Sequence, residues 1–425
     1  MTFARQSLGS LAALTFGLLV SIVLPRVLGP EARGEYQLAV KLAALVLAVA
    51  QWGIPEVLLQ LIAERKATLG ELIGTSLTLG LLGAAVVAAL LWTAAPLFTD
   101  TLLRGVDPHL LALTLTGSVV ALVGLLARRF IQLDGRLAIY NSLDVARTLL
   151  FLALVLIGGA LAPRQAIVPV WAWLLGEVGL AVAATALLPR TKWRLNATLA
   201  KNLTRSGAPI QLGLVAMFIG SEGGAFVLNA NLDVATVGIY AVALSIARLI
   251  LQVSTALRTA LQPRLIGSEV DSADLTVRVT RHGVLWMLLA AVVLAVGSPL
   301  VPLIFTAEFA AAAPALVILL PGMVAYGVWQ LVAGHLLRIG QRGFLALVAW
   351  LFAVVAIGLQ AIGIGTFGLN GAALGLSLAY LLAMSVVLVG FFRATGRAMR
   401  ELVPAPGDLA FYVGLTRRAL AATHG

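Results

Sequence analysis

Long apolar runs separated by short polar connections follow one another along the whole chain. Runs of this length match the roughly 20 residues that a helix needs to cross the hydrocarbon core of a bilayer. The connections carry helix-breaking Gly and Pro residues, and none is long enough for a separate soluble domain. The pattern predicts about twelve membrane-spanning helices, near 8–28, 36–62, 71–93, 109–127, 142–162, 169–189, 209–230, 236–260, 283–305, 313–337, 344–364 and 371–392.

Positive charge is distributed unevenly over these connections. If the amino terminus is cytoplasmic, most of the 29 Lys and Arg residues fall on the inner side, and the outer side keeps Arg26, Arg33, Arg104 and Arg164. This arrangement satisfies the positive-inside rule and predicts that both termini are cytoplasmic. The net charge of +11 is thereby explained by topology, so nucleic acid is not an expected partner.

Two motifs occur once in each half of the chain. Gly34–Ala39 opens the predicted second helix and Gly238–Ala243 opens the eighth, while 132–136 follows the fourth helix and 338–342 follows the tenth. An even number of helices per repeat keeps both halves in the same orientation, although low-diversity apolar sequence can also produce such similarity by chance. We therefore predict an all-α integral membrane protein with two six-helix lobes related by a pseudo-twofold axis along the membrane normal. Its predicted parts are an N-terminal lobe (1–189), an amphipathic cytoplasmic linker (190–208), a C-terminal lobe (209–392) and a basic cytoplasmic tail (393–425).

The composition agrees with a membrane protein and excludes several kinds of chemistry. The chain is 61% hydrophobic and 11% charged, with a mean hydropathy of +1.03, whereas a soluble fold must cover itself with polar groups. It has no cysteine, and its four histidines lack metal-ligand spacing. No phosphate-binding loop, nucleophile elbow or pair of catalytic carboxylates is recognisable. We expect no catalytic residue, no metal site and no cofactor.

A polar stripe crosses the predicted eighth helix. An arginine at mid-bilayer depth costs about 2.5–3.5 kcal/mol on insertion scales, so Arg248 is expected to face protein or water rather than lipid. The stripe predicts that this helix lines an aqueous cavity. It consists of Ser245, Arg248, Gln252, Thr255 and Thr259, at helical steps of three and four.

The other costly residues concentrate in predicted helices 1, 2 and 7. Because helices 1 and 2 are equivalent to helices 7 and 8 under the repeat, we expect all four to line the interface between the lobes. Alternatives stay open: Lys41 could snorkel to the interface, Glu222 could be a structural partner of Arg248, and Glu177 is an isolated acid with a packing role. The stripes comprise Gln37, Lys41, Gln51, Trp52 and Glu56 on helix 2 and Gln211, Glu222 and Asn229 on helix 7, with Arg26 after helix 1.

Two segments resemble signatures of a known family. Leu28–Ala39 is similar to the "LG…GxYxLA" signature of polysaccharide-biosynthesis flippases, and Val237–Ala243 followed by Leu261–Arg264 is similar to their "VGxYxxA…LxPxL" pattern. That superfamily, described as MATE-like, also holds multidrug-and-toxin exporters and peptidoglycan-precursor flippases. The motifs are short and structural, so they indicate the superfamily better than the substrate.

The resemblance implies a V-shaped central cavity and lobes that rock between inward-open and outward-open states. It implies a bacterial-type inner membrane, and transfer of an undecaprenyl-pyrophosphate-linked oligosaccharide from the inner to the outer leaflet for surface polysaccharide assembly. Expected partners are this lipid-linked oligosaccharide, membrane lipids, and glycosyltransferases and a polymerase of the same pathway. The candidate residues are Arg248, Lys41 and Arg26 for pyrophosphate, Gln252, Gln51 and Asn229 for sugar hydroxyls, and Glu222 for coupling to protons or sodium.

Three alternatives remain. A cation-coupled multidrug exporter of the same fold predicts a cavity dominated by acids, whereas the candidate residues here mix acids and bases. A peptidoglycan-precursor (lipid II) flippase shares the fold and a similar substrate. A membrane glycosyltransferase or glycan polymerase would normally carry a large outer loop, and every predicted outer loop is short.

Overall fold

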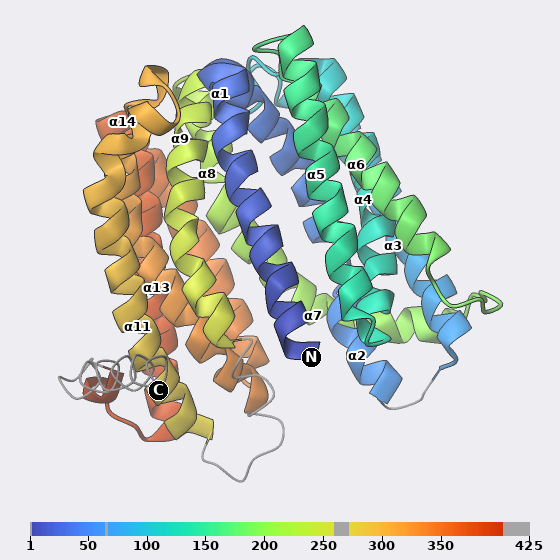
Figure 1. Ribbon diagram of the computed structural model, residues 1–425. Coiled ribbons are helices and arrows are strands. Elements are labelled where there is room, and N and C mark those ends of the chain that lie inside the picture. The colour runs from blue at the N-terminus through green and yellow to red at the C-terminus, as the bar shows by residue number, and fades with distance from the viewer. Residues whose placement is uncertain (1, 64–66, 259–271, 403–425) are drawn as a thin grey trace, which may run out of the picture.

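The helical content of the molecule confirms the predicted class. The computed structural model in Figure 1 describes residues 2–63, 67–258 and 272–402, and regular structure within these ranges is helical throughout. Ten helical segments in these ranges are long and apolar enough to cross a membrane. Two of them, α1 (Thr2–Ala50) and α14 (Arg342–Thr395), are divided by glycines in the left-handed region, Gly29 (φ 70°) and Gly368 (φ 56°). With both divided, the spans correspond to the twelve that the sequence predicts.

The elements follow one another in two successions. The first half comprises α1, α2 (Ile54–Ala63), α3 (Leu69–Ala94), η1 (Ala95–Leu97), α4 (Pro108–Leu133), α5 (Leu137–Leu161) and α6 (Ile167–Ala186). The second half begins with α7 (Ala197–Glu222), α8 (Gly224–Asn231), α9 (Val234–Ala247) and η2 (Arg248–Ile250), after which helix continues to Arg258. It ends with α11 (Ser272–Gly297), η3 (Ser298–Leu300), α12 (Val301–Ile304), η4 (Ala307–Phe309), α13 (Ala312–Arg338), α14 and η5 (Met399–Leu402).

The first two predicted helices differ from the structure at their boundaries. Only Gly29 separates them, because a glycine adopts positive φ at little cost and Pro30 is tolerated in the first turn of the next helix. The predicted continuous helix over 36–62 is wrong, since residues 51–53 interrupt it. There Trp52 (φ 51°) and Gly53 (φ 65°) both adopt left-handed backbone. The side-chain oxygen of Gln211 accepts a hydrogen bond from the Gly53 N–H at 2.7 Å and so stabilises the break.

Two groups of helices lie on either side of α1 in Figure 1. Helices α3 to α6 form one group and α9, α11, α13 and α14 form the other, and the groups diverge towards the lower end of this view. Helix α1 packs on α4 and α5 of the first group and on α9 of the second. The end that carries Gly29 is called the upper end below, and the end that carries the start of α1 is called the lower end.

A reciprocal backbone contact joins the two halves at the upper end. A Cβ added at Gly34 would overlap the carbonyl oxygen of Val234, and a Cβ at Gly238 would overlap the carbonyl oxygen of Pro30. Gly34 and Gly238 are as far apart in the sequence as Pro30 and Val234 are. The same contact is therefore made twice, once from each half, as a pseudo-twofold axis through this point requires. The repeated glycines of the sequence motifs are the residues that allow the close approach.

The connection between the halves is held against α3. The Asn196 backbone N–H donates to Thr75 Oγ1 at 3.1 Å, and its side chain donates to Glu71 at 3.0 Å. Asn196 also caps α7, which begins inside the predicted linker of 190–208. Leu199 and Leu203 are buried, whereas Trp193 is exposed. The predicted contact of this linker with the membrane surface stays a prediction, and residues 259–271 (with the 261–264 motif) and 403–425 of the predicted tail lie outside the described residues.

Candidate functional site

Helix packing fixes the backbone of Glu222, the last residue of α7. A side chain at Gly220 would overlap the Phe352 ring, and one at Gly224 would overlap the amide of Gln360. These glycines therefore let α7 and α8 lie directly against the first part of α14. Between them, the Tyr380 hydroxyl donates a hydrogen bond to Ser221 Oγ at 2.8 Å. The carboxylate of Glu222 thus extends from a backbone that is anchored in the second half.

Glu222 bridges two cations that the sequence predicts at the lobe interface. Lys41 Nζ, from the second part of α1, donates to Glu222 Oε2. Arg248 Nη2, at the point where α9 gives way to η2, donates to Glu222 Oε1. One carboxylate facing two cations leaves a net positive charge. We call these three residues the interlobe cluster, because Lys41 belongs to the first half and the other two to the second.

The three side chains of the interlobe cluster differ in their exposure to solvent. The side chain of Lys41 is 5% exposed, that of Glu222 16% and that of Arg248 36%. Lys41 therefore does not snorkel to the membrane interface but points at Glu222. Among the described residues, Glu222 is the only hydrogen-bond partner of Arg248. Most of the donors of this guanidinium remain available, and the neighbouring Gln252, one turn further along the same predicted stripe, is exposed.

Two other predicted site residues join the halves at the upper end. Arg26 donates to the backbone carbonyls of Leu303 and Ile304 at 3.0 and 2.5 Å. Asn229 is 1% exposed, and its amide donates to the carbonyls of Leu102 and Arg104 at 3.1 and 2.9 Å. In this structure both side chains thus donate to backbone carbonyls of the opposite half, and ligand contacts for Arg26 and Asn229 stay predictions. We call these contacts, together with the Arg164–Glu308 ion pair at 3.0 Å, the upper latch.

The remaining candidates are placed as follows. Gln51 is half-buried in the break between α1 and α2, and Glu56 is exposed on α2. Gln211, predicted on the polar stripe of helix 7, is buried and engaged by the Gly53 N–H. Ligand contacts for Gln51 and Gln252 stay predictions. Thr259 of the predicted stripe lies outside the described residues.

Arg33 is an interior cation that the sequence analysis missed. It was assigned to an outer connection because the second helix was expected to begin at 36, whereas the helix begins at Pro30 and Arg33 lies inside it. The residue is 8% exposed, and its guanidinium carbon lies 5.5 Å from the centre of the Tyr36 ring. Its buried Nε has no hydrogen-bond partner in the described ranges. The proline at position 30, which favours a helix start, was the signal available in the sequence.

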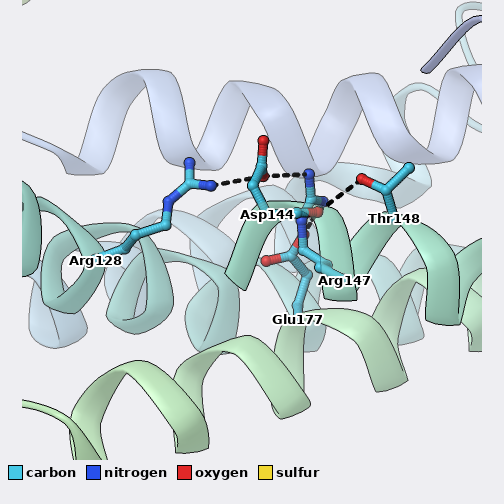
Figure 2. A network of polar contacts seen from close by, with 5 residues as sticks. All are labelled: Arg128, Asp144, Arg147, Thr148 and Glu177. Carbon is cyan, nitrogen blue, oxygen red and sulfur yellow. Dashed lines mark hydrogen bonds and ion pairs between the residues drawn. The ribbon is translucent and has the colours of Figure 1, made fainter. Parts of the chain in front are cut away.

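A second group of charges lies within the first half, as Figure 2 shows. Asp144 Oδ1 accepts from Arg128 at 2.6 Å and from Arg147, one turn further along α5, at 3.3 Å. The prediction that Glu177 is isolated is wrong, because Arg147 Nη1 donates to it at 2.8 Å. Two acids balance two bases, so this N-lobe network has no excess charge for an anion. No group of three or more His, Asp or Glu among the described side chains could hold a metal ion.

The fold and the buried charges define the class as an all-helical integral membrane protein whose two halves share an ionic cluster within membrane-length segments. Within that class, the chain belongs to the family described as "Polysaccharide biosynthesis protein", whose profile matches residues 5–268. The chain is thus a membrane transporter or flippase of this family. No curated protein matches the chain.

Solved structures of related architecture support the same fold. "Lipid II flippase MurJ, inward closed conformation" is similar with a TM-score of 0.76 at 13% identity, covering 93% of this chain and 88% of that one. An inward-facing multidrug resistance MATE family transporter has a TM-score of 0.68 at 18% identity, covering 92% and 94%. The MATE multidrug transporter DinF-BH has a TM-score of 0.66 at 14% identity, covering 94% of each chain. At these identities the likeness concerns the fold alone.

Proposed function

We propose that this protein flips a polyprenyl-diphosphate-linked oligosaccharide from the inner to the outer leaflet by alternating access, for assembly of a surface polysaccharide. The observation that carries the proposal is the interlobe cluster. Lys41 and Arg248 come from different lobes, lie within membrane-spanning segments and face a single carboxylate. The excess positive charge suits an anionic head group, and the family profile favours a polysaccharide precursor.

The physical task of such a carrier is to shield charge. Moving a dianionic head group through about 30 Å of hydrocarbon is prohibitive without compensating partners. Cations at mid-depth supply these partners, while the polyprenyl chain remains in the bilayer. Gln252, exposed beside Arg248, and Gln51 are placed in this proposal as donors and acceptors for sugar hydroxyls.

We further propose the orientation and surroundings of the carrier. The excess of Lys and Arg in the predicted inner connections favours a bacterial-type inner membrane, with the lower end and both termini cytoplasmic. In that orientation the upper latch closes the outer end. Membrane lipids, together with glycosyltransferases and a polymerase of the same pathway, are the proposed partners.

Transporters of this fold also carry other cargo, and the charges of the interlobe cluster help to distinguish between the candidate cargoes. A cation-coupled drug exporter needs acids to attract its cargo, whereas here two bases share one acid. A lipid II flippase would need the same charge match, because its cargo also carries a polyprenyl diphosphate and differs in the group attached to it. Coupling of transport to protons or sodium at Glu222 is part of the proposal, and no cofactor is invoked.

The test is glycan export in cells that depend on this protein. Arg248→Ala should reduce surface glycan at least tenfold and leave lipid-linked precursor on the inner leaflet, with normal amounts of protein in the membrane. Arg342→Ala, the same change at an exposed position at the start of α14, is the control and should export normally. Full export by Arg248→Ala would refute the proposed site.

A further inference from the structure

Both oxygens of the Glu222 carboxylate are occupied by the cations that the proposed substrate would need. Oε2 accepts from Lys41 and Oε1 accepts from Arg248. A carboxylate held between two cations has the geometry of a phosphate group held between them, since each presents anionic oxygens to N–H donors. In this structure Glu222 therefore occupies the position in which a bridging anion would satisfy both lobes.

The charges favour replacement of Glu222 by a diphosphate. A diphosphate diester carries two negative charges, which match Lys41 and Arg248 together, whereas Glu222 matches only one of them. A ligand with a single negative charge would replace Glu222 without net electrostatic gain. A close approach of the diphosphate while Glu222 stays in place would put like charges side by side, which is unfavourable.

The backbone restricts how the exchange occurs. Glu222 cannot withdraw with its helix, because Gly220 and Gly224 hold that segment flat against α14 and Ser221 is bonded to Tyr380. Its side chain must rotate away, and this breaks the contact with Lys41. Lys41–Glu222 is the ion pair of the cluster that crosses between the halves, so its loss removes a link between the lobes at mid-depth.

We propose that Glu222 is an internal competitor for the substrate: the diphosphate displaces it from Lys41 and Arg248, and this exchange releases the Lys41–Glu222 link between the lobes. This inference rests on the proposed function. It gives Glu222 two effects. Glu222 keeps the empty cluster from binding singly charged anions. Its displacement also replaces a link that is fixed to the backbone of the second half with a link through a diphosphate that is attached to neither lobe, so the arrangement of the lobes depends on arrival of a diphosphate.

The test uses the full chain in lipid nanodiscs and farnesyl-diphospho-N-acetylglucosamine as the probe. Glu222→Gln keeps the shape and the hydrogen-bonding oxygen but removes the competing charge, so the probe should bind about tenfold or more tightly than to the unaltered protein. Glu222→Asp keeps the charge on a shorter side chain, so its affinity for the probe should lie between those of Glu222→Gln and the unaltered protein. Glu401→Gln, which neutralises an arginine-paired carboxylate at the lower end, is the control and should not change the affinity.

A second readout measures the distance between the two lobes. The chain has no cysteine, so spin labels at Asp134→Cys and Gln341→Cys, both exposed at the lower ends of the two halves, report one distance. The probe should shift the distance distribution in the unaltered background, and Glu222→Gln should shift it without the probe.

The outcomes separate this inference from the proposed function. If Arg248→Ala abolishes probe binding but Glu222→Gln leaves the affinity unchanged or weakens it, the competition is refuted and the proposed site stands. A distance distribution that stays the same in Glu222→Gln would refute the link to lobe separation. If the unaltered protein does not bind the probe, or binds it as well without Arg248, the proposed function fails as well.

Discussion

The N-lobe network offers a test of how the first half is held together. Replacing Arg147 with Leu would remove the only cation hydrogen-bonded to Glu177 among the described residues, and the Glu177 side chain is 9% exposed. Asp144 would keep its 2.6 Å contact with Arg128, so one uncompensated carboxylate would remain rather than two. The change is confined to the packing of α5 against α6.

The size of the effect follows from burial. Removing one partner of a buried ion pair costs about 3–5 kcal/mol, because the other charge is left buried and unpaired. Arg147 is 32% exposed, so the lower end of that range, about 3 kcal/mol, is expected here. Glu177→Leu should cost less, about 1–2 kcal/mol, because Arg147 keeps Asp144 as a partner. The double variant should be more stable than Arg147→Leu alone.

The measurement is reversible unfolding in mixed micelles, with the free energy of unfolding determined for both single variants and for the double variant. The interaction energy from this cycle should have a magnitude of about 1–3 kcal/mol and should favour the intact pair. Additive single effects, or a loss below about 0.5 kcal/mol for Arg147→Leu, would show that Glu177 is not stabilised by Arg147.

Further predictions concern the upper end, with labelling of Gln252→Cys by an impermeant maleimide from outside as the readout. Arg26→Ala removes two hydrogen bonds across the halves, each worth about 1 kcal/mol, and should raise outside labelling about tenfold or more; unchanged labelling would contradict the latch. Gly34→Ala places a methyl against the Val234 carbonyl, which cannot move aside, and should also raise labelling. Gly213→Ala, whose added methyl would meet its nearest atom at 3.8 Å, is the control; an equal effect of both changes would refute the close approach.

The number and type of helices could be predicted because apolar runs of membrane length are a strong signal. The breaks inside them were harder to locate. The interruption at 51–53 depends on left-handed backbone at Trp52, a residue that rarely adopts it, and on a hydrogen bond from Gly53 to Gln211, more than 150 positions away. No local pattern contains that partner.

The site could be predicted in part for the same reason. An arginine at mid-span is costly wherever it lies, so Arg248 and its acid Glu222 were identifiable from cost alone. The free-energy cost of a polar side chain in the membrane does not distinguish a group that binds a ligand from one that forms a contact between the lobes. Cost alone therefore predicts Asn229 and Arg26 as ligand-binding residues, and it does not reveal that their side chains donate to backbone carbonyls of the opposite half. Likewise, Glu177 looked isolated because its partner Arg147 is on another helix.

We propose above that the interlobe cations carry a lipid-linked diphosphate across the membrane. The most direct measurement is flipping of a fluorescent farnesyl-diphospho-oligosaccharide in proteoliposomes containing the purified chain, followed by quenching from one side. Flipping should depend on the protein, fall at least tenfold in Lys41→Ala and in Arg248→Ala, and be retained in Arg342→Ala. Flipping at the unaltered rate in both cluster variants would contradict the proposal.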